Sequence, residues 1–244
     1  MDFQDKIDRE LRRWERKVLR PLSATEKMAK GLQNKLNDKI PEKIHRAVSE
    51  SVKQMVRATL LGSDYLSEQK VITNMELKER EKILADCIER YKRTAAVEGA
   101  GTGLGGIVLG MADFPLLLSI KMKFLFDAAK IYGFDVSDYR ERLFLLTIFQ
   151  LAFSKESKKR EAFEKIIGWE EQLAELPAKE VYLDSIDWKA FQLEYRDFID
   201  LPKMLQLIPG FGAIVGAVAN YHYLDILAEH AKNSCRYRLR KRNG

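Results

Sequence analysis

Apolar residues recur every three or four positions along most of the chain. Near its beginning, four of them step by 4, 3 and 4 positions: Ile7, Leu11, Trp14 and Val18. This spacing places them on one face of an α-helix, with charged residues opposite. The same pattern predicts further helices at residues 28–40, 44–61 and 77–91. No segment alternates between apolar and polar residues, so the pattern predicts an all-α protein.

The middle of the chain is richer in apolar residues. Pro115 is predicted to open an apolar helix, LLLSIKMKFLFDAAKIYG, and Gly133 to close it in the left-handed conformation. Ser137 or Asp135 is then expected to cap the next helix. Because residues 143–153 are apolar nearly all round, we expect that helix to be buried at the centre of the protein.

No low-complexity linker interrupts the sequence, which favours one helical domain over residues 1–244. Four parts of this domain differ in composition. They are amphipathic N-terminal helices (1–98), a glycine-rich segment followed by apolar core helices (99–160), acidic helices (161–200), and a glycine-rich C-terminal helix with a basic tail (201–244).

Two glycine-rich segments stand out, GAGTGLGGIVLGMADFP at 99–115 and IPGFGAIVGAVAN at 208–220. Several of their glycines are four residues apart, among them Gly101 and Gly105, Gly106 and Gly110, and Gly212 and Gly216. On a helix this spacing leaves one face without side chains, so that another backbone can approach closely. We therefore expect two glycine-rich central helices that pack together.

Other functions of these segments are weighed against that packing. A phosphate-binding loop requires a preceding strand and a following lysine, and neither is predicted here. Residues 99–120 contain a single acid and residues 204–224 carry no charge, so both reach the roughly 20 residues that span a bilayer. Their glycines and prolines lower the hydropathy, which leaves membrane insertion as an alternative.

A groove for a hydrophobic ligand is a further hypothesis. Glycine faces leave space beside bulky side chains, and apolar clefts between helices commonly bind small molecules. The bulky residues concerned follow the first glycine-rich segment: Leu116, Leu117, Leu118, Phe124 and Phe126. A lipid or fatty acyl chain fits such a groove.

Composition points to a soluble or peripheral protein. The chain is 46% hydrophobic and 32% charged, with a net charge of +6. The opening MDFQDKIDRE has no apolar region typical of a signal peptide, so we expect a cytoplasmic protein. Cys87 and Cys235 lie far apart without metal-ligand spacing, and we interpret both as small apolar helix residues.

Charge is polarised along the chain. Residues 161–200 hold eleven acidic and four basic residues, whereas residues 232–244 hold six basic residues and no acid. The basic tail suits either a solvated, frayed helix end or the phosphates of anionic lipid or nucleic acid. No nucleic-acid-binding motif is present, so we expect no nucleic acid partner.

Few polar residues suggest chemistry. Asp113 is interpreted as a helix cap before Pro115, and Asn220 as a lone amide bonded to Asp113 or to a glycine carbonyl. His222, Asp225 and Glu229 share one helical face and could hold a divalent ion with Asp113, although this is a weak pattern beside that of polar surface residues. No hydrolase motif occurs, so no catalytic residue, metal or cofactor is predicted.

The separated motifs GAGTGLGGIVLGMADFP, KIYGFD, RLFLL and IPGFGAIVGAVAN, in this order, resemble the EcsC protein family over roughly residues 90–240. The resemblance implies a set of characteristic positions: Gly101, Gly105, Gly106, Gly110, Asp113, Pro115, Gly133, Pro209, Gly212, Gly216 and Asn220. It also implies a bacterial, mostly helical protein at the membrane, linked to an ABC exporter and to protein secretion. No catalytic role accompanies these positions.

Together these observations predict a cytoplasmic protein, peripheral to the membrane, that acts without catalysis. Its expected partners are a lipid or fatty acid, the membrane surface, an apolar peptide and ABC exporter subunits. The expected ligand-binding residues are the motif positions together with Leu117 and Phe124. Two alternatives are a membrane-inserted scaffold of the exporter and an enzyme that uses Asp113 and His222.

Overall fold

The computed structural model describes residues 2–23, 42–61, 69–103, 106–185, 187 and 215–243. These residues contain helices and no β-strand, as predicted. The helices are α1 (Phe3–Leu19), α3 (Glu42–Leu61), α4 (Leu77–Gly103), α5 (Gly106–Ile131), α6 (Tyr139–Phe153), the short 3-10 helix η2 (Glu156–Lys158), α7 (Lys159–Ile167), α8 (Trp169–Glu175), α9 (Lys179–Ser185) and α12 (Val215–Asn243). The predicted helix at 28–40 lies outside the described residues.

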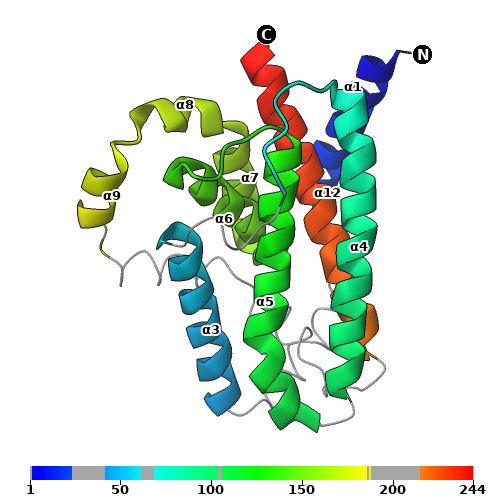
Figure 1. Ribbon diagram of the computed structural model, residues 1–244, viewed down its shortest axis with the longest axis vertical. Coiled ribbons are helices and arrows are strands. Elements are labelled where there is room, and N and C mark those ends of the chain that lie inside the picture. The colour runs from blue at the N-terminus through cyan, green and yellow to red at the C-terminus, as the bar shows by residue number, and fades with distance from the viewer. Residues whose placement is uncertain are drawn as a thin grey trace.

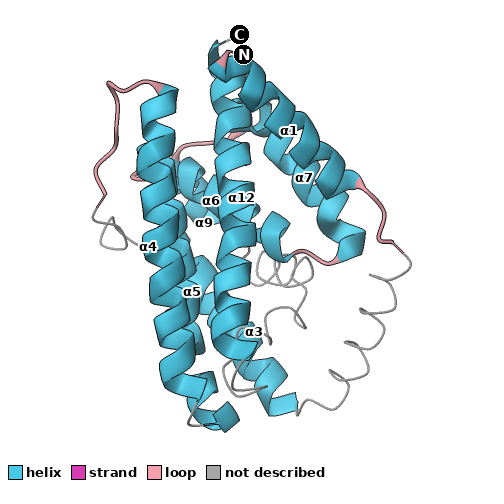
Figure 2. Cartoon of the chain, turned by 90° about the vertical axis from the view of Figure 1, so that its right-hand side faces the viewer, coloured by secondary structure: helices cyan, strands magenta, loops and turns pink. Residues whose placement is uncertain are grey.

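Three long helices, α4, α5 and α12, run side by side and form the frame of the molecule (Figures 1 and 2). The end of α4 and the beginnings of α5 and α12 lie at the lower end in both views, while the two chain termini lie at the upper end. The described parts of both glycine-rich segments therefore lie at the lower end.

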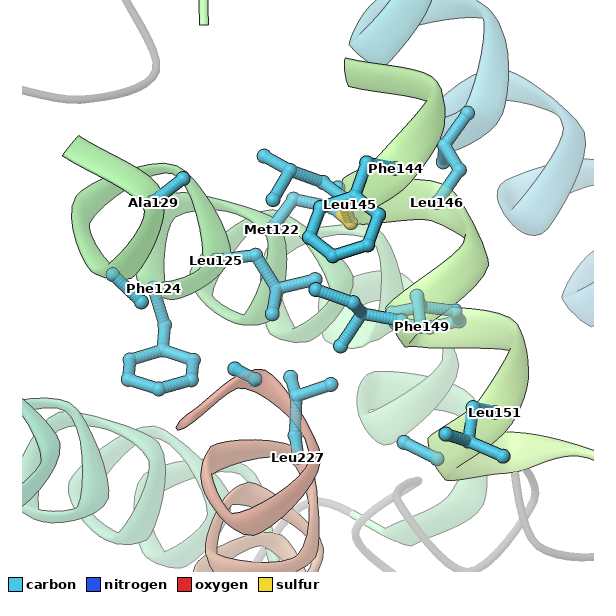
Figure 3. Packing of buried hydrophobic residues seen from close by; sticks show 14 of the residues in the cluster. Met122, Phe124, Leu125, Ala129, Phe144, Leu145, Leu146, Phe149, Leu151 and Leu227 are labelled. Atoms are coloured by element: carbon cyan, nitrogen blue, oxygen red, sulfur yellow. The ribbon is translucent and has the colours of Figure 1, made fainter. Parts of the chain in front are cut away.

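The core is one continuous hydrophobic cluster that includes residues of nearly every described helix. As predicted, α6 is its centre, because all its residues except Arg140 are buried. Figure 3 shows side chains of α6 such as Phe149 and Leu145 facing Leu125 of α5 and Leu227 of α12. A single all-α domain results.

The amphipathic prediction for α1 is confirmed, because Ile7, Leu11, Trp14 and Val18 are its buried residues. The Trp14 ring stands edge-on to Phe163 of α7, with ring centroids 5.2 Å apart. Its indole N–H donates a hydrogen bond to Nδ1 of His230 on α12 at 3.0 Å. One aromatic side chain thus attaches α1 to two other helices.

Gly133 ends α5 as predicted, with a φ of 90°. Its own N–H donates to the carbonyl of Lys130, and the next N–H, of Phe134, donates to the carbonyl of Ala129. These two bonds form a Schellman motif. A Cβ added at Gly133 would lie 2.9 Å from the carbonyl oxygen of Ile72, so space as well as φ requires glycine.

Two predicted helix starts are wrong. Pro115 lies inside α5, which already begins at Gly106, so Asp113 and Pro115 do not start a helix. A proline within a helix removes one backbone hydrogen bond, and the apolar sequence on both sides continues the helix across it. The cap of α6 is Asp138, whose carboxylate accepts from the N–H of Arg140, whereas Asp135 accepts from Ser137 within the preceding turn.

The basic tail is also different from the expectation of a frayed, solvated end. It is helical through Asn243 as part of α12. Each of its six cations forms an ion pair with a carboxylate of another element: Lys232 and Arg236 with Glu10, Arg236 also with Glu81, Arg238 with Glu141 and Glu170, Arg240 with Asp8, Lys241 with Glu171, and Arg242 with Glu141 and Glu170.

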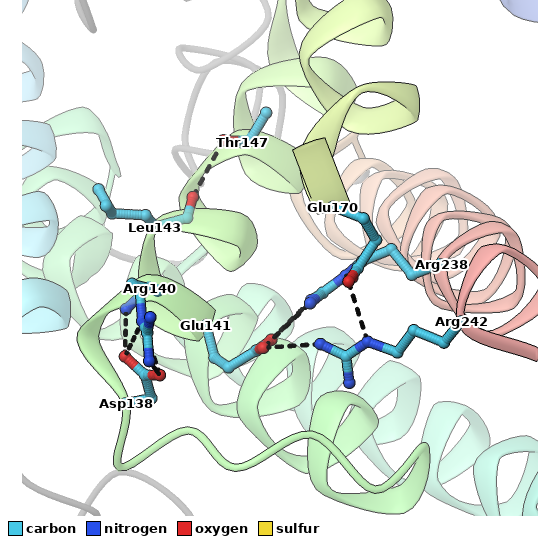
Figure 4. Close-up of polar contacts among 8 residues, drawn as sticks. All are labelled: Asp138, Arg140, Glu141, Leu143, Thr147, Glu170, Arg238 and Arg242. Carbon is cyan, nitrogen blue, oxygen red and sulfur yellow. Dashed lines mark hydrogen bonds and ion pairs between the residues drawn. The ribbon is translucent and has the colours of Figure 1, made fainter. Parts of the chain in front are cut away.

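Arg238 lies at the centre of this ion-pair network (Figure 4). Its side chain is 1% exposed and donates to both carboxylate oxygens of Glu141, at 2.6 and 3.0 Å, and to Glu170 at 2.6 Å. Its guanidinium also lies 4.4 Å from the ring centre of Phe134 and 4.3 Å from that of Phe144. Burial alone would raise the pKa of Glu170, but the hydrogen bonds and charges of Arg238 and Arg242 lower it.

We predict that Glu141→Gln lowers the free energy of unfolding by about 3 kcal/mol, because it leaves Arg238 buried without its bidentate partner. Replacing the pair together, with Glu141→Met and Arg238→Met, is expected to recover most of this loss. Urea unfolding followed by circular dichroism measures both. As a matched control, Arg240→Met breaks an exposed pair and is expected to cost less than about 1 kcal/mol. Equal losses in Glu141→Gln and Arg240→Met would contradict the prediction.

Candidate functional site

Lys121 of α5 is the most unusual polar residue in the described part of the chain. Its side chain is fully buried, with 0% exposed. The ammonium nitrogen lies 3.0 Å from Oδ1 of Asn220 and 3.5 Å from the carbonyl oxygen of Leu117, and donates to both. Among the described residues no carboxylate forms an ion pair with it. Lys121 is therefore a buried amine whose described neighbours supply dipoles.

The environment changes the acidity of Lys121. Burial lowers the pKa of its ammonium group to about 7, because a charge removed from water loses its hydration. Near neutral pH the side chain thus exists in both its charged and its neutral form. An anion placed beside it would restore the preference for the charged form.

Asn220 of α12, a predicted site residue, is 0% exposed. The expectation was that it binds Asp113 or a glycine carbonyl, and the partner that the structure identifies is Lys121. This bond joins α5 to α12, the helices that carry parts of the two glycine-rich segments. It is a polar contact between side chains of these two helices, and Lys121 lies six residues after the end of the first segment.

Sequence reasoning missed Lys121, although the pattern contained a clue. Apolar residues lie three and four positions before and after it, at Leu117, Leu118, Phe124 and Leu125. Such spacing places a lysine on the buried face of its helix. All four of these neighbours are at most 1% exposed.

The two bulky residues predicted to line a ligand groove are buried. Phe124 belongs to the hydrophobic cluster and meets the ring of Tyr91 edge-on, with centroids 5.7 Å apart. Leu117 is 1% exposed, and its carbonyl is the second acceptor of Lys121. Leu116, on the other side of the helix, is 46% exposed.

The remaining predicted positions fall near helix ends or outside the described residues. Gly101 lies in the last turn of α4, and Gly106, Gly110 and Asp113 lie in the first turns of α5. Gly216 is the second residue of α12. The side chain of Asp113 is not among the described ones, and Gly105, Pro209 and Gly212 also lie outside the described residues.

His222, Asp225 and Glu229 line one wall of a groove of about 590 Å³ between α1, α4 and α12. Asp225 pairs with Lys92 of α4 at 3.0 Å, and Glu229 pairs with Lys17 of α1 at 2.6 Å. In the part of the chain that is described, no cluster of His, Cys, Asp and Glu suits a metal ion. Asp225 and Glu229 therefore connect α12 to α4 and α1.

Neither cysteine is placed for reactivity. Cys87 of α4 and Cys235 of α12 are both buried free thiols, as their interpretation as small apolar residues predicts. Burial raises the pKa of Cys87 to about 11 and that of Cys235 to about 12. A thiol is a poor nucleophile when it is not ionised, so these residues contribute to packing. Separately, no described helix is long and apolar enough to cross a lipid bilayer.

Comparison with known proteins supplies relatives along nearly the whole chain. The sequence profile of the EcsC protein family matches residues 5–240. Protein EcsC of Bacillus subtilis (strain 168) is 47% identical over 228 residues, covering 93% of this chain and 92% of that protein. The uncharacterized protein YdbA of the same organism is 27% identical over 241 residues, covering 91% and 87%. No solved structure matches the chain.

We predict that Lys121→Met raises the free energy of unfolding at pH 7 by roughly 1–4 kcal/mol, because methionine fills the same space without a buried charge. A lysine pKa that is lowered on folding means that the unfolded chain binds more protons above about pH 7. Wild-type stability therefore rises with pH between that value and the ordinary pKa of lysine. The advantage of Lys121→Met should shrink by roughly 2–3 kcal/mol between about pH 6 and about pH 9.

Denaturant unfolding at several pH values measures this difference. Lys123→Met is the matched control, since Lys123 lies on the same helix and is only half-buried. It is expected to change stability by less than about 1 kcal/mol, without the pH dependence. A Lys121→Met variant that is less stable than the wild type at every pH would contradict the prediction.

Proposed function

Because the chain belongs to the EcsC protein family, we propose that it is a cytoplasmic accessory protein, peripheral to the membrane, that acts by binding rather than by catalysis. Its ligand is a single acyl chain with an anionic head group, such as a long-chain fatty acid. The link to an ABC exporter and to protein secretion rests on the family resemblance. The proposal of a ligand rests on Lys121.

The observation that carries the proposal is that Lys121 is fully buried and, among the described residues, has an amide oxygen and a carbonyl oxygen as acceptors but no carboxylate. A buried lysine is costly unless it is paired or neutral. A fatty acid carboxylate would supply a negative charge at the buried contact between Lys121 of α5 and Asn220 of α12. Binding would then convert a destabilising group into a charge-assisted hydrogen bond.

The surroundings suit an acyl chain. Lys121 lies fifteen residues after the first residue of α5, about 22 Å along the helix. One acyl chain spans roughly 15 Å, half the thickness of a bilayer core. Residues 99–120 hold a single acid along this stretch, so an apolar chain would meet few charges between Lys121 and the lower end of the bundle.

Exposed apolar side chains lie toward the same end. Val97 of α4 is 69% exposed, Leu116 of α5 is 46% exposed and Tyr221 of α12 is 41% exposed. Each lies in the half of its helix that is nearer to the lower end of the bundle in Figure 1. Exposed apolar groups gathered in one region favour a hydrophobic partner there.

We predict that delipidated wild-type protein binds a long-chain fatty acid more tightly than the alcohol of equal length, and that Lys121→Met loses this preference. The carboxylate requires the ammonium group, whereas the tail does not, so affinity for the acid should fall by at least about tenfold. Isothermal titration calorimetry measures both ligands, and Lys123→Met serves as the control. Equal affinity of the wild type for acid and alcohol, or no binding of either, would refute the proposal.

A further inference from the structure

The charges of α1 are divided across the helix. Two of its four acids, Asp8 and Glu10, face α12, where they pair with Arg240 at 3.3 Å and with Arg236 at 2.6 Å. These carboxylates are thus engaged by cations of another helix. The other two, Asp5 and Glu15, are exposed, and the exposed arginines of α1 outnumber them.

Four arginines of α1 form a row on its solvent side: Arg9, Arg12, Arg13 and Arg16. Their spacing of 3, 1 and 3 residues places them on one face, and all four are exposed. Among the described residues none forms an ion pair with a carboxylate. Two of their side chains donate to backbone carbonyls of α1, Arg9 to that of Asp5 and Arg16 to that of Arg12. We call these four residues the arginine row.

A small hollow accompanies the arginine row. It has a volume of about 180 Å³ and is lined by Lys6, Arg9, Arg13 and Glu10. Because Glu10 is also bound by Arg236, the hollow keeps a surplus of positive charge. Figure 2 shows α1 on the outer side of the bundle, so the arginine row is open to a large partner.

We propose that the arginine row is the surface through which this protein docks onto anionic phospholipid head groups. This inference rests on the membrane-peripheral part of the proposed function. The row extends over eight residues, from Arg9 to Arg16, or about 10 Å along the helix. It lies on an exposed helix face that can meet a flat charged surface. The tail of α12 is also rich in basic residues, but its six cations already pair with carboxylates of the protein.

Nucleic acid is the competing partner, and the composition of α1 disfavours it. Binding of single strands depends on bases that stack on exposed aromatic side chains. The aromatic residues of α1 are Trp14, which is buried, and Phe3, which packs against the hydrophobic cluster. The arginine row therefore offers phosphate binding without stacking.

The test is co-sedimentation of the full chain with vesicles of phosphatidylglycerol and phosphatidylcholine in equal parts. Each arginine near an anionic surface contributes roughly fivefold to the partition coefficient. Changing all four arginines of the row to glutamine should therefore lower binding by on the order of a hundredfold or more. Higher salt should weaken wild-type binding in the same direction.

The control removes the same number of charges elsewhere. It changes four exposed cations near or on α4 to glutamine, namely Lys70, Lys78, Lys82 and Arg93. Because these lie away from the contact, binding should fall by no more than about threefold. Equal losses in both variants would overturn the inference, since net charge alone would then explain binding. Absence of wild-type binding to these vesicles would overturn it as well.

Binding to a short DNA duplex is measured for the wild type and the row variant, to test nucleic acid as the partner. If the row variant loses DNA binding while vesicle binding is unchanged, the surface serves nucleic acid and the inference fails. Fatty acid binding in solution, without vesicles, should be unaffected by the row variant. A wild type that binds vesicles through the row but binds no fatty acid supports this inference and refutes the ligand proposed for Lys121.

Discussion

The fold depends on the ion pairs that hold the C-terminal half of α12. Hydrophobic burial supplies most of the driving force for folding, but it has no direction and tolerates sliding of one helix past another. Arg238 fixes a register because its planar guanidinium must meet Glu141 of α6 and Glu170 of α8 at once. Arg236 does the same for α1 and α4 through Glu10 and Glu81. One helix thereby positions four others.

This network also decides where the remaining charges lie. Two acids of α1, Asp8 and Glu10, and two of α8, Glu170 and Glu171, pair with cations of the tail of α12. The positive surplus is then left on the outer side of α1. At the other end of the bundle, the end of α4 and the beginnings of α5 and α12 carry glycine-rich sequence with few charges. These three helices are therefore held by ion pairs toward one end, whereas Lys121 is buried between the two ends.

Local patterns in the sequence predicted local structure well. The apolar face of α1, the buried α6 and the left-handed Gly133 each depend on residues within a few positions, so the sequence contains the necessary information. The prediction that Pro115 starts a helix was wrong, because proline occurs both at helix starts and at tolerated interior positions. The apolar residues on both sides of it continue the helix. The prediction of a frayed, solvated tail was wrong because the carboxylates that pair with it come from four elements distant in the sequence, α1, α4, α6 and α8. Lys121 was missed for a related reason: its burial depends on α12 covering that face of α5.

Lys121 and Arg238 show two ways to bury a cation. Arg238 retains its charge at every accessible pH, and three carboxylate contacts compensate for its lost hydration. Lys121 has an amide and a carbonyl as acceptors, and its pKa of about 7 lets it release the proton that it cannot stabilise. A group of this kind changes its charge with its surroundings. Arrival of a carboxylate would raise the pKa of Lys121, so above about pH 7 an anionic ligand and a proton would bind together. Arginine could not provide this coupling, which makes lysine the suitable residue for a buried site that is alternately empty and filled.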